Sequence, residues 1–186
     1  LYGRVNPGGK LAESWPYRYE DVPSSEIYGK QRDALYEEGI YVGYRYYDKA
    51  GVPVRWPFGF GLSYTSFACS NLRLEDDHVT VTVKNTGSFA SAEVVQMYVA
   101  APQNGLHRPV RELKGFQKVF LQPGEERQVT FALERRSFAL WNDGWVIPGG
   151  VYVLQVGDQS VSVEVPGSTV PAPDWQKGSF YESCRG

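Results

Sequence analysis

The class of fold is decided by the stretch Val79-Thr80-Val81-Thr82-Val83-Lys84-Asn85-Thr86-Gly87. Valine occupies every second position and alternates with a polar side chain, which is the pattern of a β-strand with one buried face. The last three residues of the stretch, Asn85-Thr86-Gly87, favour a turn, because asparagine bonds to nearby backbone and glycine accepts a positive φ. The stretch therefore predicts a half-buried strand that ends in a turn.

Short apolar runs separated by turn residues continue from this strand to about residue 165. The other expected strands are 93–101, 114–121, 129–133, 139–141, 145–147, 152–156 and 161–165. Consecutive runs are joined at Asn142-Asp143-Gly144 and Gly157-Asp158-Gln159-Ser160, which are hairpin signals. About seven or eight strands over roughly 100 residues predict an all-β fold, an immunoglobulin-like or fibronectin type III-like β-sandwich. The fibronectin type III kind is favoured because the Cys…Trp…Cys spacing of antibody domains is absent.

The first 66 residues have a different character, since they combine many aromatic rings with many turn residues. Ten of the thirteen tyrosines lie there, together with Trp15, Trp56, Phe58 and Phe60. We expect an irregular, aromatic-rich arm with at most short helices, one of them over 42–49, where Gly51 and Pro53 would end it. Each packed ring buries on the order of 150–250 Å², so the arm requires a partner surface.

These patterns predict three parts. Residues 1–66 are expected to be the tail of an otherwise missing domain and a connecting arm, 67–166 the sandwich, and 167–186 a linker or tail. Because the chain starts at Leu1 and not at methionine, we expect a fragment or a processed product.

Charge and cysteine usage narrow the function classes. A formal net charge of −2 gives no electrostatic reason for a nucleic acid or a membrane surface as partner. Cys69 and Cys184 are too few for a disulfide framework, and they form either one bridge or two free thiols. Two thiols and the lack of an Asn-X-Ser/Thr acceptor slightly favour a cytoplasmic over a secreted protein.

The sequence offers no set of residues for catalysis, for a cofactor or for a metal. Ser63 lies in Gly-X-Gly-X-Ser, which is not a nucleophile elbow, so a tight backbone turn is expected there. His78 and His107 lack other ligands at metal-binding spacing. Adjacent carboxylates in extended chain point apart, so no acid–base pair is predicted; these pairs are Glu37-Glu38, Asp76-Asp77 and Glu125-Glu126.

Two groups of residues keep two interpretations. Glu38 and Asp48 lie in the aromatic segment. One interpretation is a hydrogen bond to Arg45 or Arg55, and the other is a contact with a substrate. Trp141 and Trp145 flank a hairpin turn and either pack in a core or a domain interface, or stack on sugar rings as a carbohydrate platform.

Several strings in order carry a family resemblance. In the arm they are Asn6-Pro7-Gly8-Gly9-Lys10-Leu11, Ser14-Trp15-Pro16, Tyr36-Glu37-Glu38-Gly39-Ile40-Tyr41-Val42-Gly43-Tyr44-Arg45-Tyr46-Tyr47-Asp48 and Pro57-Phe58-Gly59-Phe60-Gly61-Leu62-Ser63-Tyr64-Thr65. In the sandwich they are Val83-Lys84-Asn85-Thr86-Gly87, Val94-Val95-Gln96-Met97-Tyr98-Val99 and Leu121-Gln122-Pro123-Gly124-Glu125. They closely resemble the C-terminal part of family 3 glycoside hydrolases of the β-glucosidase type, with the end of the α/β sandwich domain and the fibronectin type III-like domain.

The resemblance implies a non-catalytic portion of a retaining β-glucosidase that stabilises the domain assembly around the active site. In this family an aspartate nucleophile lies in a barrel domain and the acid/base usually in the α/β sandwich, and neither region is matched here. The chain alone is therefore expected to be inactive, with the remaining domains of the parent as partners and the β-glycoside bound only through the parent. A carbohydrate- or protein-binding module is the alternative, and a chain that is itself a hydrolase is a third possibility. The string at 173–181 resembles the link in relatives of reversed domain order.

Overall fold

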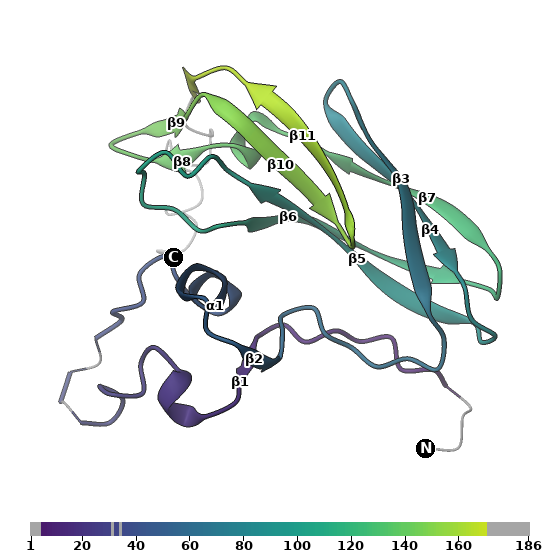
Figure 1. Cartoon of the computed structure of the whole chain (residues 1–186), viewed down its shortest axis with the longest axis horizontal. Coiled ribbons are helices and arrows are strands. Elements are labelled where there is room, and N and C mark those ends of the chain that lie inside the picture. The colour runs from purple at the N-terminus through teal and green to yellow at the C-terminus, as the bar shows by residue number, and fades with distance from the viewer. Residues whose placement is uncertain (1–4, 31, 34, 171–186) are drawn as a thin grey trace, which may run out of the picture.

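A computed structural model describes residues 5–30, 32–33 and 35–170 of the chain, and it divides them into two layers. Figure 1 shows a β-sandwich above and, beneath it, a long irregular segment that runs outward from the N-terminal side and returns. We call this segment, residues 5–66, the arm, and residues 67–170 the sandwich.

The sandwich is built from two antiparallel sheets. One has the order β11-β10-β5-β6 and the other β3-β4-β7. Their bounds are β3 Phe67–Glu75, β4 His78–Asn85, β5 Ser91–Ala100, β6 Glu112–Leu121, β7 Glu126–Ala132, β10 Gly150–Val156 and β11 Gln159–Val165. A smaller sheet has the order β12-β9-β8, with β8 Leu140–Trp141, β9 Trp145–Ile147 and β12 Ser168–Thr169. The predicted all-β sandwich of the fibronectin type III kind is confirmed.

The core lies between the two sheets, where the alternating residues of each strand meet. Val79, Val81 and Val83 of β4 are fully buried, as their spacing predicts. They pack in one cluster with Met97 of β5 and Leu154 of β10. The period-two pattern in the sequence thus identified the buried face of the central strands.

Strand β3 was not among the expected strands, because its alternation changes phase in the middle. Phe67 and Cys69 turn inward at odd positions, whereas Leu72 and Leu74 do so at even positions. The change occurs at Asn71, whose φ is 54°, where the register with β4 shifts. A β-bulge of this kind inserts one residue and reverses which positions face the core.

The sandwich also extends beyond the boundary at residue 166 that the composition suggested. Ser168 and Thr169 pair with Ile147 and Val146 of β9, so this part of the expected linker is a strand. The backbones at Gly149 and Gly167 lie so close that a Cβ on Gly149 would stand 2.9 Å from the Gly167 nitrogen. Glycine at both positions permits this close approach. Composition alone suggests a linker here, because glycine is also common in linkers.

The arm is irregular except for short elements: β1 Trp15–Pro16, η1 Tyr19–Asp21, α1 Tyr44–Ala50 and β2 Val54–Trp56. The helix expected over 42–49 forms two residues later, and Gly51 ends it with a left-handed φ of 66°. The outward and returning runs are bonded to each other, since Leu11 N donates to Phe60 O and Gly59 N to Leu11 O, both at 2.8 Å. A second short 3₁₀ helix, η2, spans Arg135–Ser137. No helix in the described part of the chain is long and apolar enough to cross a membrane.

Candidate functional site

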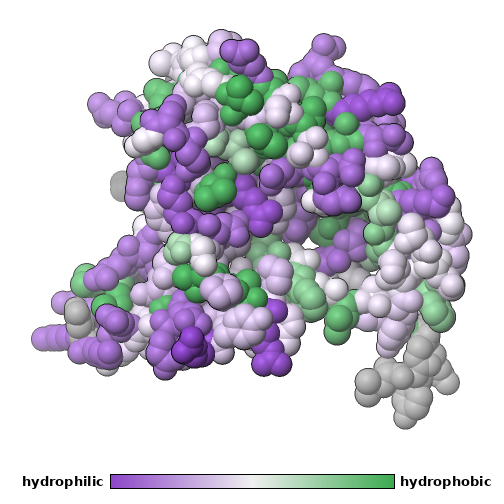
Figure 2. All heavy atoms as spheres, in the orientation of Figure 1, coloured by the Kyte–Doolittle hydropathy of each residue, from purple (hydrophilic) through white to green (hydrophobic). Residues whose placement is uncertain are grey.

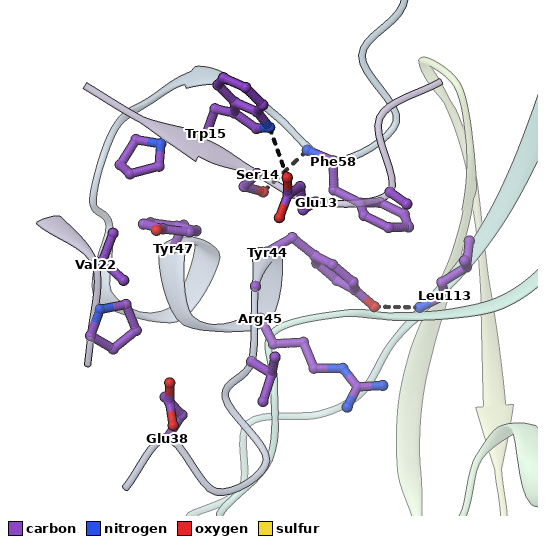
Figure 3. A pocket seen from close by; sticks show the side chains of 15 residues that line it. Glu13, Ser14, Trp15, Val22, Glu38, Tyr44, Arg45, Tyr47, Phe58 and Leu113 are labelled. Atoms are coloured by element: carbon purple, nitrogen blue, oxygen red, sulfur yellow. Dashed lines mark hydrogen bonds between the residues drawn. The ribbon is translucent and has the colours of Figure 1, made fainter. Parts of the chain in front are cut away.

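The arm is fixed to the sandwich by the aromatic side chain of Tyr44 in α1. The Leu113 backbone N–H donates to its hydroxyl at 2.8 Å (Figure 3). Its ring lies 5.0 Å from Phe58 and 5.9 Å, edge to face, from Tyr98 of β5. Burial raises the pKa of Tyr98 to about 12, although the Arg111 guanidinium opposes the shift. The contact between arm and sandwich is therefore a cluster of aromatic rings in which Tyr98 is buried.

Ion pairs surround this cluster, and their partners differ from those expected. Asp48 accepts from Arg111 Nε at 2.7 Å, and not from Arg45 or Arg55. Arg55 instead lies over the ring of its neighbour Trp56, 4.6 Å from the centroid. The partner of Asp48 is 63 positions away, so only the folded chain brings the two together.

Next to this cluster, the arm and the sandwich line a cavity of about 830 Å³, which we call the arm cavity; Tyr44, Phe58 and Leu113 lie in its wall. Figure 3 shows Tyr47, Val22 and Trp15 around one part of it and Glu38 at its edge. Tyr47 is buried, and this burial raises the pKa of its hydroxyl. The carboxylate of Glu13 accepts from Trp15 Nε1 at 3.1 Å. The arm cavity thus combines an apolar wall with a few polar groups at its edge.

The arm also leaves a set of large aromatic side chains in contact with solvent. Tyr36 is 89% exposed and Tyr28 77%. The set, which we call the outer aromatic residues, consists of Trp15, Tyr17, Tyr19, Tyr28, Tyr36 and Tyr64. On the face seen in Figure 2, the arm below the sandwich carries hydrophobic residues interspersed with hydrophilic ones. A surface so rich in exposed rings is typical of a protein interface.

Comparison with known proteins gives the same family for both layers. The family model described as a fibronectin type III-like domain matches residues 93–160. Thermostable beta-glucosidase B of Acetivibrio thermocellus is 43% identical over 172 residues, which cover 86% of this chain and 23% of that protein. Probable beta-glucosidase K of Emericella nidulans is 46% identical over 173 residues, which cover 90% of this chain and 21% of that protein.

Solved structures agree. The GH3 beta-glucosidase of Bifidobacterium adolescentis superposes with a TM-score of 0.84 at 39% identity, over 97% of this chain and 29% of that one. Beta-glucosidase 3B from Thermotoga neapolitana in complex with glucose superposes with a TM-score of 0.84 at 39% identity, over 91% of this chain and 26% of that one. The chain belongs to glycoside hydrolase family 3. It corresponds to the C-terminal part of the family's β-glucosidases, and it spans about a fifth of the length of these curated relatives.

Within this family 3 segment, the glycine-rich stretch around Ser63 is a structural turn. Ser63 Oγ donates to Asn6 Oδ1 at 3.1 Å and accepts from the Thr65 N–H. Gly59 has a φ of +82°, and a Cβ on Gly61 would clash with the backbone carbonyl oxygen of Gly9. The turn therefore requires glycine for both its conformation and its packing, as the sequence predicted.

The histidines and paired carboxylates of this family 3 chain lie at separate places. His78 Nδ1 is 3.1 Å from the carboxylate of Asp77, which lies in the turn after β3. The hydrogen bond to Asp77 raises the pKa of His78. His107 packs edge to face on Tyr41. Glu125 bonds to Gln122 N and Arg127 and caps a turn. Among the residues that the structure describes, no three His, Cys, Asp or Glu side chains are grouped to hold a metal. The possible partner of Cys69, Cys184, lies outside the described residues.

Trp141 and Trp145 lie on the two strands of the β8–β9 hairpin, which the Asn142-Asp143-Gly144 sequence predicted. Their rings meet edge to face at 5.6 Å, and Trp141 is 60% exposed. Both line a second cavity with Arg108, Glu112 and Lys114, which the sequence analysis did not single out. The signal that could have identified them is the density of charged residues between Arg108 and Lys114.

Proposed function

We propose that this chain is the non-catalytic C-terminal portion of a retaining β-glucosidase, and that its arm packs against the remaining domains and stabilises their assembly. The observation that carries the proposal is the two-sided character of the arm. Its inner side packs on the sandwich through Tyr44 and Asp48, whereas its outer aromatic residues are 47–89% exposed to solvent. Burial of such rings in a domain interface stabilises the assembly by about 25 cal/mol per Å².

The reaction proposed for the parent follows its relatives. Beta-glucosidases from Thermotoga neapolitana and Kluyveromyces marxianus have been solved in complex with glucose, which supports a β-glucoside as substrate. Retaining hydrolysis requires two carboxyl groups about 5–5.5 Å apart. We assign neither of them to this chain, because described carboxylates such as Asp48 and Glu126 are held in ion pairs with Arg111 and Lys84.

The proposal predicts that the chain restores a truncated relative. Beta-glucosidase 3B of Thermotoga neapolitana, expressed without the part that this chain matches, is mixed with the purified chain. Binding is measured by calorimetry, and hydrolysis of an aryl β-glucoside is measured in parallel. We expect binding and a gain of activity in the mixture and no turnover by the chain alone.

Variants locate the contact. Tyr17→Ser and Tyr36→Ser each remove an exposed ring from the arm, and each should weaken binding on the order of tenfold, as for residues near the centre of an interface. Val151→Ser on β10 is the control, since it removes an exposed apolar residue from the sandwich. Binding that is equally tight in all three variants would contradict the proposal, as would hydrolysis by the chain alone.

A further inference from the structure

A second cavity, of about 560 Å³, lies at the end of the sandwich near the β8–β9 hairpin. We call it the basic cavity and define it by Arg108, Glu112, Lys114, Arg136, Trp141 and Trp145. Its volume falls in the range of ligand pockets, about 300–1,000 Å³. A bulge in β6 contributes to it, because Gly115 pairs with Met97 and Leu113 with Tyr98, which leaves Lys114 as the extra residue. Bulges commonly redirect a side chain in this way.

The charge of the basic cavity is unbalanced. Its lining includes four Arg or Lys side chains and one carboxylate, that of Glu112. Arg108 and Lys114 each lie 3.5 Å from Glu112, and Arg45 of the arm lies 3.7 Å from it. Arg136 is placed over the ring of Trp145, 4.0 Å from the centroid. One carboxylate shared at such long distances leaves a net positive potential, which favours an anionic ligand.

Two buried groups in the wall have hydrogen-bond capacity that the described residues do not use. The Arg108 side chain is 3% exposed, and neither its Nε nor its Nη1 has a partner within the described part of the chain. The same holds for the buried indole Nε1 of Trp145. All three atoms are donors. A buried donor without a partner is energetically unfavourable, so these atoms favour a ligand rich in hydrogen-bond acceptors.

The rim adds a surface for a ring. Trp141 is 60% exposed and lines the same cavity. The face of an indole carries negative potential and attracts the partly positive C–H groups of a sugar ring. We propose that the basic cavity binds a sugar of the uronic acid class, with its carboxylate bonded to Arg108 and its ring packed on Trp141. An arginine N–H forms a charge-assisted hydrogen bond to a carboxylate, which makes Arg108 suited to this role. The proposal does not depend on the role of the arm.

The test compares three small ligands on the ¹⁵N-labelled chain by NMR. D-glucuronate carries both recognised groups, D-glucose lacks the carboxylate, and acetate lacks the ring. We expect a saturable shift of the Trp145 indole N–H signal with glucuronate, weakened by salt. Glucose should give no shift at the same concentration, and acetate should bind on the order of tenfold more weakly.

Variants connect this shift to the cavity. Arg108→Gln and Lys114→Gln should each reduce the affinity for glucuronate on the order of tenfold. Because loss of a buried arginine can impair folding, Lys114→Gln provides an independent test. Arg127→Gln is the control, since Arg127 bonds to Glu125 on the surface of β7. No saturable shift with glucuronate, an equal response to glucose or acetate, or unchanged binding in both cavity variants would each overturn the proposal.

Discussion

The most connected polar residue of the sandwich is Asn85, at the end of β4. Its side chain is fully buried, and its Nδ2 donates to Phe89 O at 2.8 Å and Leu121 O at 3.1 Å. Its Oδ1 accepts from Thr65 Oγ1 at 2.6 Å and from the Gly87 N–H. A single amide thus holds together the end of the arm, the turn after β4 and the end of β6.

Replacing this amide should therefore destabilise the whole sandwich. We expect Asn85→Ala to lower the free energy of unfolding by about 3 kcal/mol, because it leaves buried groups such as Leu121 O without partners. Urea unfolding monitored by circular dichroism measures the change. Asn142→Ala is the matched control, since Asn142 is exposed in the hairpin turn and should change stability by at most about 0.5 kcal/mol. A loss below about 1 kcal/mol for Asn85→Ala would contradict the assignment.

At the scale of the elements, sequence reasoning was reliable where one period holds throughout. Strand β4 keeps its alternation from Val79 to Val83, and β5 keeps its own through Met97 and Val99, so both were predicted with the correct buried face. β3 was missed because the bulge at Asn71 shifts the pattern by one position. β1 and β12 have two residues each, too few to show a period.

The bulge in β6 gives a prediction for an element. A Cβ on Gly115 would lie 2.9 Å from Cδ1 of Phe131 on β7, so the side chain of Phe131 occupies the space that the missing side chain on β6 leaves. Gly115→Ala should lower the free energy of unfolding by about 1–3 kcal/mol, as other overpacked cores do. The backbone conformation at Gly115 suits alanine, so the loss reports only the steric contact.

The companion variant tests this cause. Phe131→Leu makes room for the new methyl group, so Gly115→Ala should cost less in that background, by roughly 1 kcal/mol of coupling. Thermal unfolding of the two single variants and the double variant gives the coupling energy. Strict additivity would show that the loss has another origin than contact with Phe131.

At the scale of the whole molecule, the sequence predicted that the arm needs a partner but not which residues attach it. Tyr44 contacts the Leu113 backbone 69 positions away, and Asp48 contacts Arg111 63 positions away. No local pattern encodes pairs so distant, which explains why Arg45 and Arg55 were expected in place of Arg111. The basic cavity was missed for the same reason, because the arm, the β6 bulge and the β8–β9 hairpin form it together.

The unequal burial of the two layers yields the last prediction. Tyr47 is the one buried hydrophobic residue among the described residues of the arm, whereas Val79, Val81 and Met97 lie in a continuous sandwich core. Regions with few buried apolar contacts open at lower free energy than the core. The amide hydrogens of Leu11 and Gly59 should therefore exchange with an opening free energy about 2 kcal/mol or more below that of Val81.

Hydrogen exchange followed by NMR separates this local opening from global unfolding. Tyr44→Phe removes the hydroxyl that accepts from the Leu113 N–H, so it should accelerate exchange at Leu11 and Gly59 while Val81 keeps its rate. The opening free energy of the arm should rise again when the truncated relative binds, because the outer aromatic residues then become buried. Equal opening free energies at Leu11 and Val81 in the free chain would contradict this prediction. They would show that the arm and the sandwich unfold together as one cooperative unit.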